Sequence, residues 1–344
     1  MLMPFITSIF LRLLLTSLLA FALMIILGKP MIKWLQLAQI GQVIRNVGPE
    51  SHFSKKGTPT MGGTLLIIAI TLSSLCFGDW HNPLLIMALL TLWLFGGIGF
   101  WDDYKKLILK HHGGLPARQK YFWQTLFALG LTFWLYHHLH NVLGGTGVFI
   151  PFGHSIPLGV GVFVLAYFTL TGSSNAVNLT DGLDGLAIIS VLLVALGLGT
   201  VALMESSVFP TSHVMPIPQT VDLAILAAAI LGASLGFLWF NSFPALVFMG
   251  DVGSLGLGAM LGFMAVCLQM ELVLVIMGGI FVLETVSVIL QVGSFKLRNK
   301  KRIFKMAPIH HHFELSGWPE PRVVMRFSII TAILVVVGIL SLLI

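Results

Sequence analysis

Apolar stretches long enough to cross a bilayer alternate with polar segments along the whole chain. A transmembrane helix needs roughly 20 mostly apolar residues. Only helices or closed barrels satisfy every backbone group in lipid, and these runs are too long and continuous for barrel strands. The pattern predicts about ten transmembrane helices, at residues 7–28, 60–78, 83–100, 121–139, 157–172, 185–204, 219–239, 254–269, 271–291 and 327–344.

The first apolar run contains Arg12, which lies near enough to the outer end of its span to snorkel to the surface. Residues 29–40 extend the same helical pattern toward the cytoplasm. No small-residue cleavage site follows the run, so we interpret it as a retained first helix rather than a signal peptide.

Composition supports a membrane protein. Of the 344 residues, 57% are hydrophobic and 9% are charged, whereas a soluble domain averages about 25% charged residues. The mean hydropathy is +0.97. The chain shows no internal repeat, so we expect residues 1–344 to form a single domain, an all-α polytopic bundle.

Lys and Arg occur only around the odd-numbered connections between spans, apart from Arg12, and none occurs from Tyr121 to Phe295. Cytoplasmic loops carry an excess of these residues, so we expect the odd-numbered loops to be cytoplasmic and both termini to be periplasmic. The net charge of +6 is then mainly a topology signal that also favours anionic lipids, and it gives little support to nucleic-acid binding. The basic residues concerned are Lys29, Lys33, Arg45, Lys55, Lys56, Lys105, Lys106, Lys110, Arg118, Lys120, Lys296, Arg298, Lys300, Lys301, Arg302, Lys305, Arg322 and Arg326.

The acidic, basic and histidine clusters fall in five cytoplasmic segments, which we expect to form an active site: residues 41–63, 101–120, 172–185, 241–254 and 293–326. In the second segment, Asp102 and Asp103 end an apolar helix. Like charges this close resist joint ionisation unless a cation lies beside them, and Lys106 lies one helical turn from Asp102. The alternative interpretation is a solvated helix end.

The third segment carries Asn175, Asn178, Asp181 and Asp184 at intervals of three. If the segment is helical, neighbouring members share a face, whereas its glycines permit tight turns and a close approach to a ligand. So many oxygen ligands suit Mg²⁺, which prefers carboxylates together with substrate phosphates.

In the fourth segment, Asp251 opens a predicted span, where it serves either as a helix cap or as a metal ligand. Phe248 is either a core residue or a platform for a flat base. Glu284, inside the ninth span, is costly in lipid and should face the bundle interior, for a structural hydrogen bond or for catalysis.

The fifth segment holds three adjacent histidines, His310, His311 and His312. This is not the usual zinc spacing, and in an extended segment His310 and His312 would point one way and His311 the other. Donors to phosphate oxygens or a sugar fit better. The first segment offers Lys55 before a helix, a plausible anion site. No P-loop is present, so phosphate binding should depend on Mg²⁺ and Lys.

Taken in order, the motifs GTPTMGG, DDY, NAVNLTDGLDGLA, FMGDVGS and APIHHHFE resemble those of the phospho-N-acetylmuramoyl-pentapeptide-transferase (MraY) family. The resemblance runs along the chain as far as WPEPRVVMRF, before the last span. The acidic motifs alone indicate the wider polyprenyl-phosphate sugar-1-phosphate transferase superfamily, and PIHHHFE points to the muramoyl-pentapeptide branch.

The resemblance implies a ten-helix enzyme, usually a homodimer, at the inner face of the bacterial cytoplasmic (inner) membrane. Such an enzyme transfers phospho-MurNAc-pentapeptide from UDP-MurNAc-pentapeptide to undecaprenyl phosphate with Mg²⁺. The products are lipid I and UMP, in the first membrane step of peptidoglycan synthesis.

The same resemblance implies residue roles. Asp251 falls on the Mg²⁺ ligand, and catalytic roles are expected for Asp102, Asp103, Lys106, Asp251 and His310. Substrate contacts are expected from Lys55, Lys120, Asn175, Asn178, Asp181, Gly182, Leu183, Asp184, Asn241, Phe248, Gln291, Ala307, His311 and His312. Among these, Gln291, Ala307, His310 and His311 fall on the sugar and peptide side.

Two other functions remain open at this point. A polyprenyl-phosphate GlcNAc-1-phosphate transferase would share the fold and the Mg²⁺ chemistry, and the histidine segment argues against it. A transporter or flippase fits ten spans and Glu284, but transporter sites tend to lie near the bilayer midplane, whereas the clusters here lie at one predicted surface.

Overall fold

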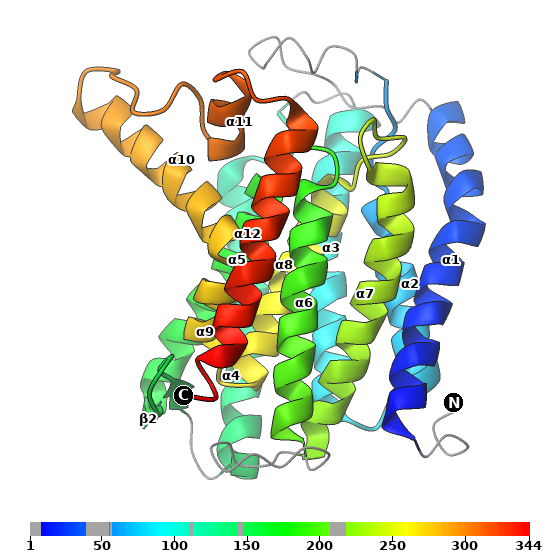
Figure 1. The fold of residues 1–344 in the computed structure, drawn as a ribbon, viewed down its shortest axis with the longest axis vertical. Coiled ribbons are helices and arrows are strands. Elements are labelled where there is room, and N and C mark those ends of the chain that lie inside the picture. The colour runs from blue at the N-terminus through cyan, green and yellow to red at the C-terminus, as the bar shows by residue number, and fades with distance from the viewer. Residues whose placement is uncertain (1–7, 39–54, 56, 110–112, 144–146, 207–217) are drawn as a thin grey trace.

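The computed structural model describes residues 8–38, 55, 57–109, 113–143, 147–206 and 218–344, and these are almost entirely helical (Figure 1). Among them, eight helices are long and apolar enough to cross a membrane. They are α1 (Ile9–Leu37), α3 (Pro83–Leu107), α5 (Val162–Thr180), α6 (Leu186–Glu205), α7 (Val221–Asn241), α8 (Gly250–Cys267), α10 (Gly279–Leu297) and α12 (Glu320–Leu340). The prediction of an all-α, multi-pass membrane protein is confirmed.

The remaining elements are shorter or less apolar. They are α2 (Gly63–Phe77), α4 (Ala117–Leu143), α9 (Glu271–Met277), α11 (Ile309–Glu314), the 3₁₀ turns η3 (Gly159–Gly161) and η4 (Pro218–Thr220), and the strands β1 (Gly147–Phe149) and β2 (Ser155–Pro157). The two strands pair antiparallel, with Val148 opposite Ile156. Each of the ten predicted spans thus contains helix, but the ninth is divided into α9 and α10 at Gly278.

Both ends of the chain lie at one end of the bundle, because α1 begins and α12 ends there (Figure 1). Successive helices from α1 to α8 alternate in direction, so the ends of α3, α5 and α7 meet the starts of α4, α6 and α8 at the opposite end, beside α11. We call this opposite end the site end. The predicted gathering of polar segments at one end is therefore found among the described residues, whereas Arg45, Lys56 and Lys110 lie outside them.

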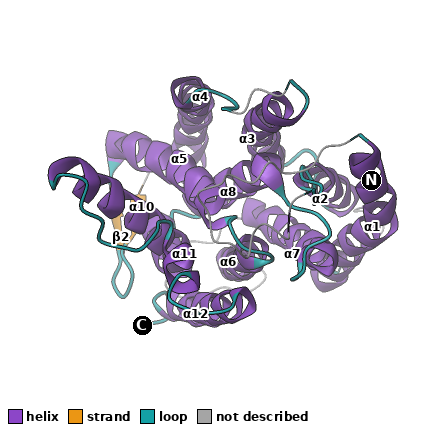
Figure 2. Ribbon diagram, turned by 90° about the horizontal axis from the view of Figure 1, so that it is seen from above, coloured by secondary structure: helices purple, strands orange, loops and turns teal. Residues whose placement is uncertain are grey.

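Helix α8 lies in the middle of the bundle, surrounded by other helices (Figure 2), and it packs mainly against α3 and α5. Close approach to α3 requires a glycine. A Cβ on Gly99 would collide with the backbone carbonyl of Asp251. This contact sets the last turns of α3 beside the first turn of α8, and so brings Asp102 next to Asp251.

One local expectation is wrong. Arg12 does not snorkel: it is only 8% exposed and donates to Asp222 Oδ1 at 3.1 Å and to the carbonyl oxygen of Phe77 at 2.8 Å. A charge with partners inside the bundle has no need to reach water. The histidine segment is not extended, since His310–His312 lie in helix α11, where adjacent side chains diverge by about 100°.

Candidate active site

Five acidic and basic side chains from three helices form one cluster at the site end, which we call the Asp–Lys cluster. Its members are Asp102, Asp103, Lys106, Lys120 and Asp251. The Oδ2 atom of Asp251 lies 2.9 Å from Lys106 Nζ and 3.1 Å from Lys120 Nζ. The same two ammonium groups lie 2.9 and 3.4 Å from Oδ2 of Asp102. Carboxylates from α3 and α8 therefore share both lysines.

The two adjacent acids of α3 have different surroundings. Asp102 accepts a hydrogen bond from the backbone N–H of Leu115 at 2.6 Å through Oδ1 and turns Oδ2 to the lysines. Asp103 accepts from the backbone N–H of Val252 at 3.2 Å, in the first turn of α8. Asp102 therefore faces the lysines, while Asp103 joins α3 to the first turn of α8.

Helix α5 contributes the amide that completes the surroundings of Asp251. Asn178 Nδ2 donates to Asp251 Oδ1 at 2.7 Å and to Ser254 Oγ at 2.8 Å. One turn earlier, Asn175 donates instead to Gln124 Oε1 on α4, at 3.0 Å. Asp251 lies inside the first turn of α8 and makes no capping bond. Its carboxylate faces the lysines and Asn178, so the capping alternative is not needed to explain it.

Asp181 ends α5 as a half-buried carboxyl that accepts no hydrogen bond among the described residues. Burial, together with the neighbouring carboxylates of Asp251 and Asp184, raises the pKa of Asp181 to about 8. The protein alone therefore leaves one carboxyl here without a positive partner.

A second network, which we call the Lys55 network, joins residues from distant parts of the chain. Lys55 Nζ lies 2.6 Å from both Asp184 Oδ1 and Glu320 Oε1. Glu320 Oε1 also accepts the backbone N–H of Asp184 at 2.7 Å, and Asp184 Oδ2 accepts that of Ala245 at 3.0 Å. Glu320 was missed by sequence reasoning, and the only signal for it was an acid opening an apolar span.

The other residues expected around a nucleotide surround this network. Asn241 Oδ1 accepts from the backbone N–H of Gly185 at 3.1 Å, and its Nδ2 donates to the carbonyl of Val247 at 2.8 Å. Leu183 is buried beside the start of α12. Phe248 is half-buried, and its backbone N–H donates to Pro59 at 2.8 Å. The structure therefore brings Lys55, Leu183, Asp184 and Asn241 together.

The three histidines of α11 point in three directions. His310 is fully buried, with Nδ1 3.1 Å from Glu284 Oε1, although the two are not aligned for a hydrogen bond. A Cβ on Gly182 would collide with its imidazole, so this turn requires glycine. His311 Nδ1 lies 2.8 Å from Glu314 Oε2, and His312 Nδ1 accepts the backbone N–H of Lys305 at 3.1 Å. Of the three, His310 packs directly on Gly182, and the prediction that Glu284 faces the interior is confirmed.

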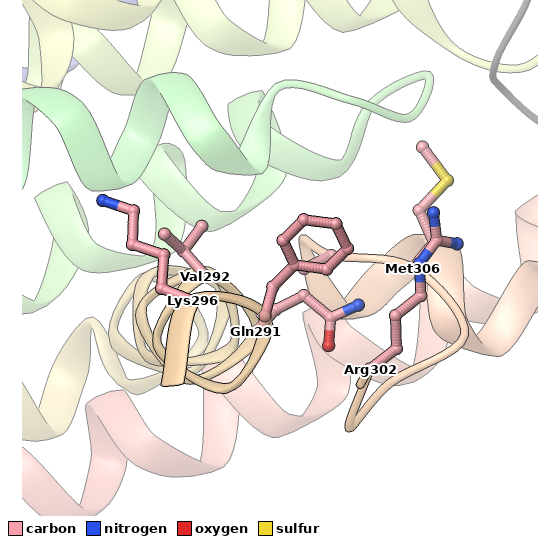
Figure 3. A pocket seen from close by; sticks show the side chains of 7 residues that line it. Gln291, Val292, Lys296, Arg302 and Met306 are labelled. Carbon is pink, nitrogen blue, oxygen red and sulfur yellow. The ribbon is translucent and has the colours of Figure 1, made fainter. Parts of the chain in front are cut away.

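Two predicted residues line a cavity between the end of α10 and the loop that follows it (Figure 3). Gln291 Oε1 accepts the backbone N–H groups of Ile303 and Phe304, both at 3.0 Å, and its Nε2 donates to the carbonyl of Phe304. Gln291 thereby shapes the loop. Ala307 lines the same cavity and leads into α11.

The oxygen atoms around Asp251 fit a hard cation in their chemistry. Within the described part of the chain, no three His, Cys, Asp or Glu residues are grouped to hold a metal by themselves. Mg²⁺ does not require such a cage, because it binds through one or two carboxylates together with substrate phosphates and water. Asp251, and Asp181 without a positive partner, supply carboxylates of that kind.

Among known protein families, the model for glycosyl transferase family 4 matches residues 85–269. The matched region contains every member of the Asp–Lys cluster, with Asn178 and Asp181. It does not contain Lys55, Glu320, the cavity or the three histidines of α11.

Proposed function

The chain belongs to glycosyl transferase family 4, and we propose that within it the protein transfers phospho-MurNAc-pentapeptide from UDP-MurNAc-pentapeptide to undecaprenyl phosphate. The family accounts for the general chemistry, a phosphoglycosyl transfer from a nucleotide sugar to a lipid phosphate. The choice of the muramoyl-pentapeptide donor is supported by the segment from Ala307 to Glu314, which lies beyond the matched residues.

One observation supports this chemistry above the others: the carboxylates of Asp102 and Asp251 hold two lysines in common at the end of a membrane bundle. A reaction between two phosphate-bearing substrates must first overcome their mutual repulsion. Ammonium groups fixed by carboxylates are available to phosphate oxygens without losing their position. At the site end, a soluble nucleotide sugar and a lipid phosphate can both reach them.

In the direct route, an oxygen of the lipid phosphate attacks the β-phosphorus of the UDP-sugar. A phosphorus–oxygen bond forms there as the bond to UMP breaks. A phosphate monoester has its second pKa near 6, so the nucleophile is already largely dianionic and needs orientation more than a strong base. Lys106 and Lys120 would hold phosphate oxygens, and Asp102 would orient the nucleophile or accept a residual proton.

We further propose that Asp251 holds Mg²⁺ together with the donor's phosphates. The ion would supply charge neutralisation at the pyrophosphate. Asn178 would keep the Asp251 carboxylate oriented through its 2.7 Å hydrogen bond, and the Lys55 network would shape the nucleotide side.

A two-step route through a phosphorylated aspartate is the mechanistic alternative. Radioactive phosphate trapped on the protein, together with UMP exchange in the absence of lipid, would rule out direct attack.

The proposed setting is a bacterial inner membrane with the site end facing the cytoplasm, in agreement with the concentration of Lys and Arg in the segments of that end. A homodimer is part of the same proposal. The apolar helices are those of a membrane protein, and the family is one of transferases, which argues against a transporter.

The test is UMP release by the purified protein with undecaprenyl phosphate and Mg²⁺, comparing UDP-MurNAc-pentapeptide with UDP-GlcNAc. Release only with the muramoyl donor supports the proposal. Release with UDP-GlcNAc instead assigns the protein to the sister activity, and a folded but silent protein contradicts both.

A further inference from the structure

The segment that follows α10 is strongly basic. Residues 296–305 contain six cations and no acid: Lys296, Arg298, Lys300, Lys301, Arg302 and Lys305. Only two of the six, Lys296 and Arg302, line the cavity (Figure 3). The rest of its lining is Gln291 and the apolar side chains of Val292, Phe295, Met306 and Ala307.

The cavity presents positive charge to a ligand. Within the described residues, no carboxylate lies within ion-pair distance of Lys296 or Arg302. Arg302 makes one weak hydrogen bond, to the carbonyl of Lys305 at 3.3 Å. The amide of Gln291 is already bonded to the backbone of the loop. Two cations without a carboxylate partner, beside apolar walls, suit an anionic group carried on an apolar body.

A short stretch of chain joins the wall of the cavity to a residue beside the candidate active site. Its wall at Ala307 leads into α11, where His310 packs on Gly182, next to Asp181. An extended peptide spans about 3.3–3.6 Å per residue, so five residues cover roughly 17 Å. Helix α11 has six residues, which rise about 9 Å, so an extended pentapeptide is longer than the helix that separates Gly182 from the cavity wall.

We propose that Lys296 and Arg302 form a binding site for carboxylate groups of the peptide carried by the nucleotide-sugar donor. This inference rests on the proposed function. It gives these two residues a part in donor selection, because a donor without a peptide has no group to place there. A peptide attached through its N-terminus always keeps a carboxylate at its other end.

Anionic lipid headgroups are the competing occupant, since a run of basic residues beside a membrane attracts them. That attraction depends on the total charge of the segment, so substitution of any one of its six cations should weaken it equally. A carboxylate site in the cavity depends on two positions. Lys301 provides a matched control: it is exposed, adjacent to Arg302 and equally charged, but it does not line the cavity.

The experiment compares Lys296→Gln, Arg302→Gln and the double variant with Lys301→Gln in the UMP-release assay. Each protein receives two muramoyl donors, one with free peptide carboxylates and one in which they are amides. We expect each cavity variant to raise KM for the carboxylate donor about tenfold, close to 1.4 kcal/mol, with kcat unchanged. KM for the amide donor should not change, and Lys301→Gln should behave as wild type.

An equal rise in KM for both donors would overturn the proposal. So would a loss of activity that is shared by Lys301→Gln and restored by vesicles rich in phosphatidylglycerol, which would assign the cations to lipid.

If the wild type releases no UMP from the muramoyl donor, the proposed function fails separately. The cavity is then tested by equilibrium binding of the free pentapeptide and its amide. Loss of carboxylate-dependent binding in the double variant supports the site, and equal binding by wild type and double variant overturns it.

Discussion

Clusters of acidic and basic side chains lie at both ends of this bundle, and they are built differently. At the end that holds the termini, one cation meets one anion: Arg12 pairs with Asp222 Oδ1, whose second oxygen accepts from Asn82 Nδ2 at 2.8 Å. The Arg12 side chain also donates to the carbonyl of Phe77. The positive and negative charges are equal in number, and each charged group has a partner. These contacts join the ends of neighbouring helices. We call these residues the Arg12 network.

At the site end, acidic groups outnumber basic groups. In the Asp–Lys cluster the two lysines pair with Asp102 and Asp251, Asp103 accepts a backbone N–H instead, and Asp181 lies nearby without a hydrogen-bond partner among the described residues. Retaining a surplus of buried or half-buried acids is costly. This difference indicates that the Arg12 network serves stability, whereas the Asp–Lys cluster holds its charges for a ligand. Four substitutions examine this distinction, in order of decreasing expected effect.

The largest effect is expected for Asp251→Asn. The amide keeps the size of the side chain but removes the charge that holds Lys106 and Lys120. We expect kcat to fall by at least about 10³-fold, or roughly 4 kcal/mol, with little change in the thermal unfolding midpoint. The measurement is UMP release at saturating substrates beside a melting curve in detergent. A near wild-type rate would remove Asp251 from the chemistry.

Next comes Arg12→Met, which leaves Asp222 buried without its cation. Breaking a buried pair by removing one partner costs about 3–5 kcal/mol, so the unfolding midpoint should fall substantially. The turnover of the remaining folded protein should stay at the wild-type value. The double variant Arg12→Met/Asp222→Leu should recover part of the lost stability. A reduced kcat in folded Arg12→Met would show that the two clusters are coupled.

The Lys55 network lies between the Arg12 network and the Asp–Lys cluster in its number of charged groups, because one lysine pairs with two carboxylates. Glu320→Gln should loosen both Lys55 and the turn at Asp184, raising KM for the nucleotide donor roughly 10- to 100-fold through loss of charge-assisted hydrogen bonds of about 1.5–3 kcal/mol. We expect kcat to stay within a few-fold. Arg322→Gln, exposed in the same turn of α12, is the control. An unchanged KM with a lowered melting temperature would make Glu320 purely structural.

The sequence was sufficient to predict most of the architecture. Long apolar runs form helices in lipid, and helices accordingly occur in all ten predicted spans. Because successive spans alternate in direction, the acidic segments lie at one end of the bundle. The pairing of Asp102 with Lys106 was also predictable, since both lie on one helix one turn apart. These features depend on local pattern and on the membrane.

What escaped prediction depends on contacts between distant residues. Arg12 and Asp222 are separated by 210 positions and Lys55 and Glu320 by 265, and no periodicity links such partners. The helix α11 was missed because six residues carry little periodic signal. The division of the ninth span at Gly278 was missed because apolar residues continue on both sides of this glycine.

The smallest expected effect concerns Asp181, the acid without a positive partner at the site end. Its pKa in the folded protein is about 8, against 3.8 for an ordinary aspartate. Between these values the native state keeps a proton that the unfolded chain has released, so this group makes stability fall as pH rises from about 4 to about 8.

In the metal-free and substrate-free protein, the unfolding midpoint of the wild type should therefore fall more steeply over this window than that of Asp181→Asn. Added Mg²⁺ should flatten the wild-type curve near pH 8, because a cation replaces the proton, and should leave the Asp181→Asn curve closer to its metal-free form. Parallel curves for wild type and Asp181→Asn would show that folding does not raise the pKa of this carboxyl, and that the site end already stabilises its negative charge.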